Sequence, residues 1–452
     1  MSGPAYEQEI MNTIFSKKRA SRFALHLIFA LAPTILLYLV FELILFKPFL
    51  PLVPLRYQQY LPEPLQMLSQ PSKQKTMPHD YVLILGDSYA AGWGDWFMGA
   101  DIGKNPPYAS HDLLHQLINK DVVQSGFAGG SPMDTLIRKP INRYRYLRKM
   151  LLYKPEEPKK IVWIFNESND FLDNINRFHG VWKGKIDESR LYDKTYFRNF
   201  LDTEVLKSDA LYYDVRKFYK RWYYQLPMFY LIRETAYRAF EKHPVSKAAI
   251  ASPTPALDQD TNIYQTLGGA RQIENRNISC PPMTLLTADE FKMSVYVTGM
   301  CLDRLRDFFP HSEMIIVYVP SAVTSYPMIS KYVAAKIENQ ENSFIEETSK
   351  VFAESSRTFE AVSQLAYERG ISLIDTRPAL HHTAASVGPV HGPKDWHHFN
   401  HLGYQTLAQC IADHIDLENE NRPSLPVNKI DSLQRNRFWR HSRTSQMQLL
   451  VQ

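Results

Sequence analysis

A serine, a histidine and an acid that lie far apart in this chain carry the side chains that acyl transfer requires. Ser88 follows an apolar, β-branched run from Tyr81 to Leu85 that predicts a buried strand. A serine hydroxyl becomes a nucleophile when a histidine takes its proton and a carboxylate orients that histidine. Asp395 and His398 are three residues apart, so one turn of chain can set the carboxylate against one ring nitrogen and leave the other for Ser88. We therefore predict a catalytic triad of Ser88, His398 and Asp395.

The same chemistry needs fixed N–H donors for the oxyanion that forms on the substrate carbonyl. Asn169 can offer a side-chain amide, and Gly129 can bring a backbone N–H close because it has no side chain. The alternatives that the sequence leaves open are Asn166 for the amide and Gly126 or Gly130 for the backbone donor.

The elements that must position these residues alternate between strands and helices. Beyond the first strand, we expect strands at 121–124, 161–165, 314–319 and 371–375, and helices at 110–119, 288–309 and 342–369. This alternation predicts a mostly parallel sheet covered by helices on both faces. Functional groups gather at the carboxyl ends of the strands in such folds, and Ser88, Gly129 and Asn169 each follow a predicted strand.

Four short blocks, taken together and in this order, resemble the SGNH/GDSL hydrolase superfamily. They are Gly86-Asp87-Ser88, the glycine turn at 126–130, Ser168-Asn169-Asp170, and Asp395-x-x-His398 followed by Asn400, Gly403 and Tyr404. The resemblance implies a flavodoxin-like, three-layer α/β/α fold with a mostly parallel sheet. It also implies roles: Ser88 as nucleophile and oxyanion donor through its N–H, Gly129 and Asn169 as the other donors, His398 as base and Asp395 as the acid that orients it.

Two positions depart from the superfamily pattern. Glu167 stands where the third block usually has glycine, and Gln124 stands where the second block usually begins with asparagine. We expect Glu167 to add bulk and negative charge near the oxyanion site. Asp87 is expected to be structural.

Two other site chemistries compete with this interpretation. The α/β-hydrolase fold places its nucleophile in G-x-S-x-G, but Ala90 occupies the place of the second glycine here. A metal site could use Asp395, His397, His398 and His401, but it would leave Ser88 and the glycine turn unexplained. We therefore expect neither a metal nor another cofactor.

The segment from Phe23 to Phe46 predicts a membrane anchor. It is almost uninterrupted apolar sequence, and at about 1.5 Å per residue it is long enough to span a hydrocarbon core of roughly 30 Å. A cluster of basic residues precedes it, so the positive-inside rule predicts a cytoplasmic N-terminus and an extracytoplasmic or periplasmic remainder, held at the plasma (inner) membrane by a single pass. The alternative is a cleaved signal peptide ending at Ala30-Leu-Ala32, but the apolar run continues well past Pro33. We interpret His26 and Glu42 as tolerated polar residues near the ends of the anchor.

The chain divides into seven predicted parts. They are a cytoplasmic segment at 1–22, a transmembrane anchor at 23–46, a Pro-rich connector at 47–78, the first half of the SGNH domain at 79–172, an aromatic-rich helical insertion at 173–287, the second half of the SGNH domain at 288–416 and a basic tail at 417–452. For the aromatic stretch at 211–240 we consider packing against the core, a carbohydrate platform beside the site, or a membrane-facing surface.

Charge and cysteine content exclude some partners. The net charge of +5 is dispersed, so we expect no nucleic-acid partner. The basic tail is either solvated or in contact with anionic lipid headgroups. Among the three cysteines, Cys280 and Cys301 are the expected pair if a disulfide forms.

These observations predict a membrane-anchored, extracytoplasmic serine esterase that removes a small acyl group, most simply acetyl, from an envelope or secreted glycan. The alternatives are an O-acyltransferase that uses the same triad on an exopolysaccharide or cell-wall sugar, or an inactive glycan-binding component. The expected partners are an acylated carbohydrate, the membrane through 23–46, and envelope polysaccharide machinery.

Overall fold

The computed structural model describes ten segments of the 452-residue chain: residues 21–22, 25–58, 61–95, 110–150, 153–212, 226–240, 261–273, 278–282, 285–337 and 344–417. Residues Met1–Ala412 form one compact unit and Asp413–Gln452 a second. Residues 1–20 of the predicted cytoplasmic segment and 418–452 of the basic tail lie outside the described residues.

A parallel sheet of five strands forms the centre of the first unit. Its strands are β1 (Val82–Gly86), β2 (Val122–Gln124), β3 (Lys160–Asn166), β6 (Glu313–Val319) and β9 (Ser372–Asp375). They lie in the order β2-β1-β3-β6-β9, and every neighbouring pair is parallel. The mostly parallel sheet expected from the sequence is thus confirmed.

The strands form because their residues are apolar and β-branched, and both of their faces are buried. Every residue of β1 is buried, as are six of the seven residues of β3. Parallel strands with both faces covered are continuous apolar runs rather than alternating ones. Trp163, Ile316 and Leu83 belong to one large core cluster, together with residues of α7, α8, α12 and α13.

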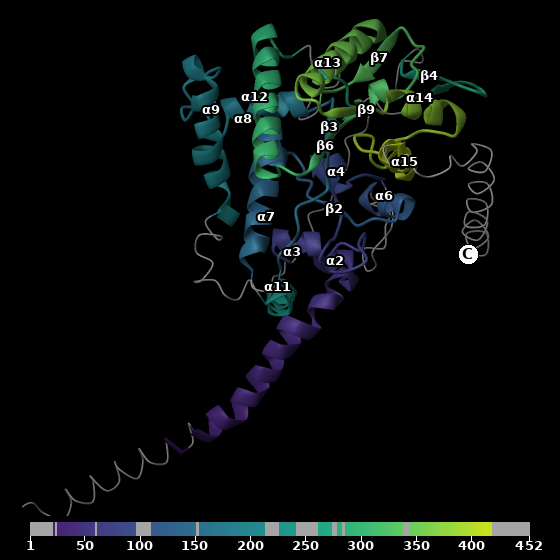
Figure 1. Cartoon of the computed structure of the whole chain (residues 1–452). Helices are drawn as coiled ribbons and strands as arrows, with labels where there is room; N and C mark the ends of the chain where they lie inside the picture. The colour runs from purple at the N-terminus through teal and green to yellow at the C-terminus, as the bar shows by residue number, and fades with distance from the viewer. Residues whose placement is uncertain are drawn as a thin grey trace, which may run out of the picture. The chain divides into compact units, whose positions relative to one another are not determined.

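Helices cover this sheet (Figure 1). The α-helices are α2 (Leu55–Gln58), α3 (Glu63–Leu68), α4 (Ser88–Ala91), α6 (Ser110–Ile118), α7 (Lys139–Lys149), α8 (Asp170–His179), α9 (Lys194–Phe200), α11 (Pro227–Phe240), α12 (Ala288–Phe308), α13 (Thr348–Glu368), α14 (Arg377–Ser386) and α15 (His401–Leu417). π-Helices occur at η1 (Phe41–Leu45), η3 (Met133–Arg138) and η5 (Leu201–Val205), and 3-10 helices at η2 (Lys47–Leu52), η4 (Glu188–Arg190), η6 (Leu206–Ser208) and η10 (Val323–Ser325).

Two antiparallel hairpins differ from what the sequence predicts. The expected helix at 342–369 begins only at Thr348, because β8 (Phe344–Glu347) pairs with β7 (Tyr332–Ala335) instead. Inside the stretch predicted to be a helical insertion, β4 (Ile263–Thr266) pairs with β5 (Gly269–Gln272). That stretch is therefore not purely helical, and the predicted domain boundaries stay a prediction.

The N-terminal segment is helical over residues 25–40 and continues into η1. Within the parts that the structure describes, no helix has both the length and the apolar character needed to cross a membrane. Phe23 and Ala24, where the predicted anchor starts, are not described.

Cys280 and Cys301, the pair that the sequence favours if a disulfide forms, are both free and buried. Cys301 lies on the core-facing side of α12 with Leu302 and Leu305. Cys280 instead donates its backbone N–H to Lys336, beside the β7 segment.

Candidate active site

Ser88 lies where β1 turns into α4. Gly86 ends the strand with φ +143°, and a side chain on it would come within 2.7 Å of the Ile164 carbonyl oxygen, so this close packing requires glycine. Asp87 then caps α4 by accepting a hydrogen bond of 2.9 Å from the Tyr89 N–H. Ser88 is therefore the first helical residue, whose N–H has no intrahelical acceptor, and it is only 4 % exposed.

The predicted contact between the Ser88 hydroxyl and the His398 ring is present. Ser88 Oγ lies 2.9 Å from His398 Nε2, and His398 Nδ1 lies 2.7 Å from Asp395 Oδ2. Because Nδ1 faces a carboxylate, the proton belongs on Nδ1, which leaves Nε2 to accept the Ser88 proton. The three side chains therefore have the order and spacing of a Ser-His-Asp triad.

Backbone groups hold the Asp395 carboxylate in place. Its Oδ1 accepts hydrogen bonds from the N–H groups of His397, at 2.9 Å, and of His398, at 3.3 Å. Burial opposes ionisation of this carboxyl, but the hydrogen bond and charge of His398 outweigh it and lower the pKa of Asp395 below its usual value. The acid is therefore ionised when it orients His398.

The chain around His398 is fixed to the segment after Ser88. The Tyr89 hydroxyl donates to the His397 carbonyl, and the Tyr404 hydroxyl donates to the Trp93 carbonyl. A side chain on Gly94 would come within 2.2 Å of the Phe399 carbonyl oxygen, so the two segments can meet only because residue 94 is glycine. The loop that carries the base is thus braced against the helix that carries the nucleophile.

Asp87 also accepts hydrogen bonds from both candidate amides, those of Asn166 and Asn169. Its Oδ2 accepts hydrogen bonds of 3.0 Å from both Asn166 Nδ2 and Asn169 Nδ2. Asn166 Oδ1 accepts hydrogen bonds from the Ser168 N–H and hydroxyl, so the oxygen end of this amide stabilises the turn after β3. Asn169 Oδ1 is buried and has no hydrogen-bond partner within the described residues. Each amide donates one N–H to Asp87 and has a second, so the choice of Asn169 over Asn166 as the oxyanion donor stays a prediction.

Glu167, the residue that departs from the superfamily pattern, is hydrogen-bonded to three hydroxyl groups. Its buried carboxylate accepts hydrogen bonds from the hydroxyls of Tyr318, Thr324 and Ser355, which come from β6, η10 and α13. Three hydroxyl donors thus surround the Glu167 carboxyl. The Glu167 carboxyl is thus held by these three hydroxyls. Its effect on the oxyanion site stays a prediction.

Two of the three glycines in the turn after β2 have contrasting surroundings. A side chain on Gly126 would come within 2.3 Å of the Ala91 backbone nitrogen, so Gly126 lets this loop pack against α4. Gly129 is exposed and has φ +67°, and a side chain there would meet open space. The Gly129 N–H donates no hydrogen bond within the described residues, which keeps it available to a substrate.

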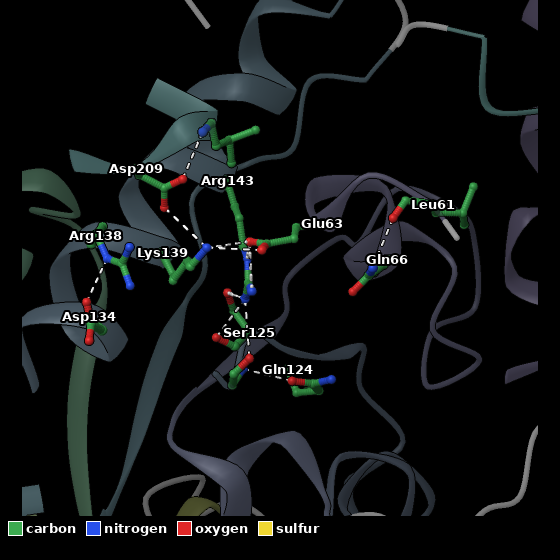
Figure 2. A network of polar contacts seen from close by, with 12 residues as sticks. Leu61, Glu63, Gln66, Gln124, Ser125, Asp134, Arg138, Lys139, Arg143 and Asp209 are labelled. Carbon is green, nitrogen blue, oxygen red and sulfur yellow. Dashed lines mark hydrogen bonds and ion pairs between the residues drawn. The ribbon is translucent and has the colours of Figure 1, made fainter. Parts of the chain in front are cut away.

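A buried ionic network holds the start of this turn (Figure 2). Arg143 of α7 donates from Nη1 to the Ser125 carbonyl at 2.9 Å and to the Ser125 hydroxyl at 2.8 Å. Glu63 of α3 pairs with Arg143 at 3.2 Å and with Lys139 at 3.0 Å, and Lys139 also lies 3.4 Å from Asp209. Arg143 therefore links α3, which lies within the predicted connector, to the loop that carries Gly129.

The alternative metal site is not formed. In the part of the chain that the structure describes, no three His, Cys, Asp or Glu side chains are grouped to hold a metal ion. Burial lowers the pKa of His397 to about 4, and it lowers the pKa of His401 as well.

Sequence reasoning missed two residues of this region. Trp93 is 52 % exposed and its ring centroid lies 6.4 Å from that of His398. A tryptophan between two glycines, five residues after the serine, is a signal that could have found it. Arg143 was also missed, and no local pattern marks it, because its contact with Ser125 depends on how α7 packs.

Comparisons with known proteins found solved structures that resemble this chain only weakly. No protein-family model and no curated protein matches the chain. An alpha/beta hydrolase enzyme from the metagenome of Lake Arreo, Spain, is 12% identical with a TM-score of 0.30, and covers 75% of this chain and 95% of its own. An extracellular lipase from Streptomyces rimosus is 10% identical with a TM-score of 0.31, and covers 74% of this chain and 98% of its own. The acetyl xylan esterase Est2A from the rumen bacterium Butyrivibrio proteoclasticus is 9% identical with a TM-score of 0.29, and covers 75% of this chain and 64% of its own. At TM-scores of this size, these likenesses carry no argument about the fold or activity of this chain.

Proposed function

We propose that this protein is a membrane-anchored, extracytoplasmic serine esterase of the SGNH type that removes a small acyl group from an envelope or secreted glycan. The observation that carries the proposal is the hydrogen-bonded chain from Ser88 Oγ to His398 Nε2 and from His398 Nδ1 to Asp395. A serine, histidine and aspartate so connected have the arrangement that activates a nucleophile for acyl transfer.

The reaction follows from this geometry. His398 takes the Ser88 proton as Ser88 Oγ attacks the ester carbonyl, and Asp395 stabilises the imidazolium that forms. The tetrahedral oxyanion is stabilised by the N–H of Ser88, the N–H of Gly129 and the amide of Asn169. His398 then protonates the departing sugar oxygen, which leaves an acyl-serine. Water attacks this ester with His398 again as base, and the free acid and Ser88 are released.

The strand order supports the SGNH type. The sheet runs 2-1-3-4-5 when its strands are numbered in chain order, which is the flavodoxin-like arrangement. Ser88 follows β1 and Asn169 follows β3, two adjacent parallel strands. Both residues therefore lie at the carboxyl edge of the sheet, where the SGNH blocks would place them.

Trp93 supports a carbohydrate substrate. Its exposed ring lies beside His398 and thus borders the reacting centre. An indole can pack against the apolar face of a sugar while leaving its hydroxyls in water. The described part of the 211–240 stretch gives no such support, because α11 contacts residues near the membrane-proximal connector instead.

Burial of the nucleophile favours one alternative, transfer of the acyl group to a sugar hydroxyl. Ser88 is nearly inaccessible, and a site that excludes water protects an acyl-serine from hydrolysis. Supplying an acetyl donor and an oligosaccharide separates the two reactions: an esterase accumulates acetate, whereas a transferase accumulates acetylated sugar.

Fluorophosphonate labelling of the purified full-length protein tests the proposal. We expect covalent labelling of the wild type, no labelling of Ser88→Ala, and no effect of a chelator. A folded wild-type protein that resists labelling would contradict the enzyme and favour a glycan-binding component. Carbonate extraction of membranes tests the anchor separately, since an integral protein stays in the pellet.

A further inference from the structure

A cationic cavity lies next to the predicted anchor, away from the Ser88 site. It has a volume of about 580 Å³ and is lined by η2 and by the segment 71–77, just before β1. Three lysines, Lys47, Lys73 and Lys75, line it, and none of the lining residues is acidic. The cavity therefore suits an anion.

The three lysines differ in their burial and in the groups that they contact. Lys73 is buried and donates to the Met67 carbonyl at 3.2 Å and to the Gln70 carbonyl, and burial lowers its pKa to about 7. Lys73 therefore stabilises the backbone of residues 67–70. Lys75 is exposed, and the ammonium of Lys47 lies 5.2 Å from the centre of the Tyr153 ring. Lys47 and Lys75 thus line the cavity from two segments, η2 and the stretch before β1.

Exposed apolar side chains adjoin this cavity. Leu52, which lines it, is 68 % exposed, and Phe49 on the same 3-10 helix is 51 % exposed. Ile44 and Leu45 are also exposed, and they continue the exposed apolar side chains of the helix at 25–40. Contiguous apolar surface of this kind marks a contact with a membrane or another protein.

Helix α11 adds to the same face. Leu231 packs against the small cluster that contains Leu50 and Tyr153, while Phe229 and Ile232 are exposed. The Glu42 carboxylate accepts hydrogen bonds from the Met228 N–H at 2.5 Å and from the Tyr38 hydroxyl at 2.8 Å. Glu42 is thus the acceptor that joins the anchor to the first turn of α11, rather than merely a tolerated polar residue. Figure 1 shows α11 at the junction between the N-terminal helix and α2 and α3.

We propose that this face docks on the bilayer and that the cavity binds the headgroup phosphate of an anionic phospholipid. The inference rests on the membrane placement in the proposed function. A phospholipid matches the site because its phosphate suits Lys47 and Lys75 while its acyl chains suit the apolar rim at Phe49 and Leu52. The site would hold the enzyme at a fixed height and orientation above the membrane.

Thermal unfolding of the full-length protein in a neutral detergent tests the site. Dioctanoyl phosphatidylglycerol is expected to raise the Tm saturably, whereas dioctanoyl phosphatidylcholine is not. Lys47→Gln/Lys75→Gln is expected to raise the lipid concentration for half the shift by about tenfold or more. The matched control Lys183→Gln/Lys194→Gln removes two exposed lysines elsewhere and should respond as the wild type does. Lys75→Gln alone changes an exposed side chain and should give a smaller loss, even if Lys47→Gln disturbs folding.

Three results would overturn the proposal. They are equal shifts with both lipids, an unchanged phosphatidylglycerol response in both lysine variants, and the full shift reproduced by inorganic phosphate or glycerol phosphate at the same concentration. The last would assign the cavity to a soluble phosphate compound. Ser88→Ala should keep the lipid response, so loss of fluorophosphonate labelling and loss of lipid binding are separate failures.

Discussion

The side-chain amide of Asn169 donates a hydrogen bond of 3.0 Å to the buried carboxylate of Asp87, the residue just before Ser88. The same carboxylate caps α4 through the Tyr89 N–H. Asp87 therefore fixes the nucleophile and the amide relative to each other. A residue expected only to be structural thus aligns two parts of the proposed site.

Asn169→Ala tests which amide acts on the oxyanion. We expect kcat for p-nitrophenyl acetate to fall about 100- to 1000-fold, because one donor to the transition state is lost. Asn166→Ala should instead cost about 1–3 kcal/mol of stability, because it leaves the Ser168 N–H unsatisfied in a buried turn. Kinetics and thermal unfolding of both variants decide the matter, and similar losses of kcat in the two would contradict the assignment.

His398→Ala and His397→Ala form a second matched pair. The first removes the base that contacts Ser88, so fluorophosphonate labelling and turnover should fall by roughly 1000-fold or more with the fold retained. Within the described residues, the hydrogen bonds from His397 to the site come from its backbone N–H and carbonyl, so His397→Ala should keep most activity. Equal loss from both would break the proposed triad.

Arg143→Gln tests whether the ionic network positions the glycine turn. Without the guanidinium, the Ser125 carbonyl loses its anchor and the turn that carries Gly129 shifts, so we expect kcat to fall by roughly ten- to 100-fold with little change in KM. Arg304→Gln, which breaks a 2.8 Å pair between α12 and Asp202 of η5, is the control. Partial rescue by Arg143→Lys would support positioning. A loss of thermal stability with unchanged kcat would show that Arg143 serves folding alone.

Gly126→Ala and Gly129→Ala separate packing from chemistry in the same turn. Gly126→Ala would drive a methyl group into the Ala91 backbone, so we expect poor folding or loss of activity. Gly129→Ala keeps the N–H and meets open space, so it should cost only about 1 kcal/mol for the left-handed backbone. Unfolding midpoints and kcat measured together check this, and the reverse order would place the oxyanion donor elsewhere.

The buried histidine His391 predicts a pH dependence of stability. Burial lowers its pKa to about 3, well below the ordinary value near 6.5. Between these values the unfolded chain binds a proton that the folded protein does not, so this histidine makes stability rise with pH through that window and level off above about 6.5. His391→Asn should lower the slope of the unfolding free energy by about 1.4 kcal/mol per pH unit between pH 4 and 6. Chemical unfolding at several pH values checks this, and parallel curves for both proteins would refute it.

Much of the fold followed from local pattern. The apolar runs that became β3 and β6 were predictable because a strand buried on both faces needs continuous apolar sequence, and both lie within a residue or two of their predicted limits. The β4–β5 hairpin was not predictable in the same way. Its β5 residues are all exposed and have no apolar pattern, so pairing rather than burial defines that strand.

The sequence alone determined the kinds of groups available at the site: a serine after a buried strand, an Asp-x-x-His segment and asparagines after the strand predicted at 161–165. Only the tertiary structure decided how they are used. It turned Glu167 toward Tyr318, Thr324 and Ser355, bound both asparagines to Asp87, and set Arg143 against Ser125. The physical reason is that backbone geometry and burial repeat with a short period along the chain, whereas a hydrogen bond between residues far apart in sequence depends on how whole strands and helices pack.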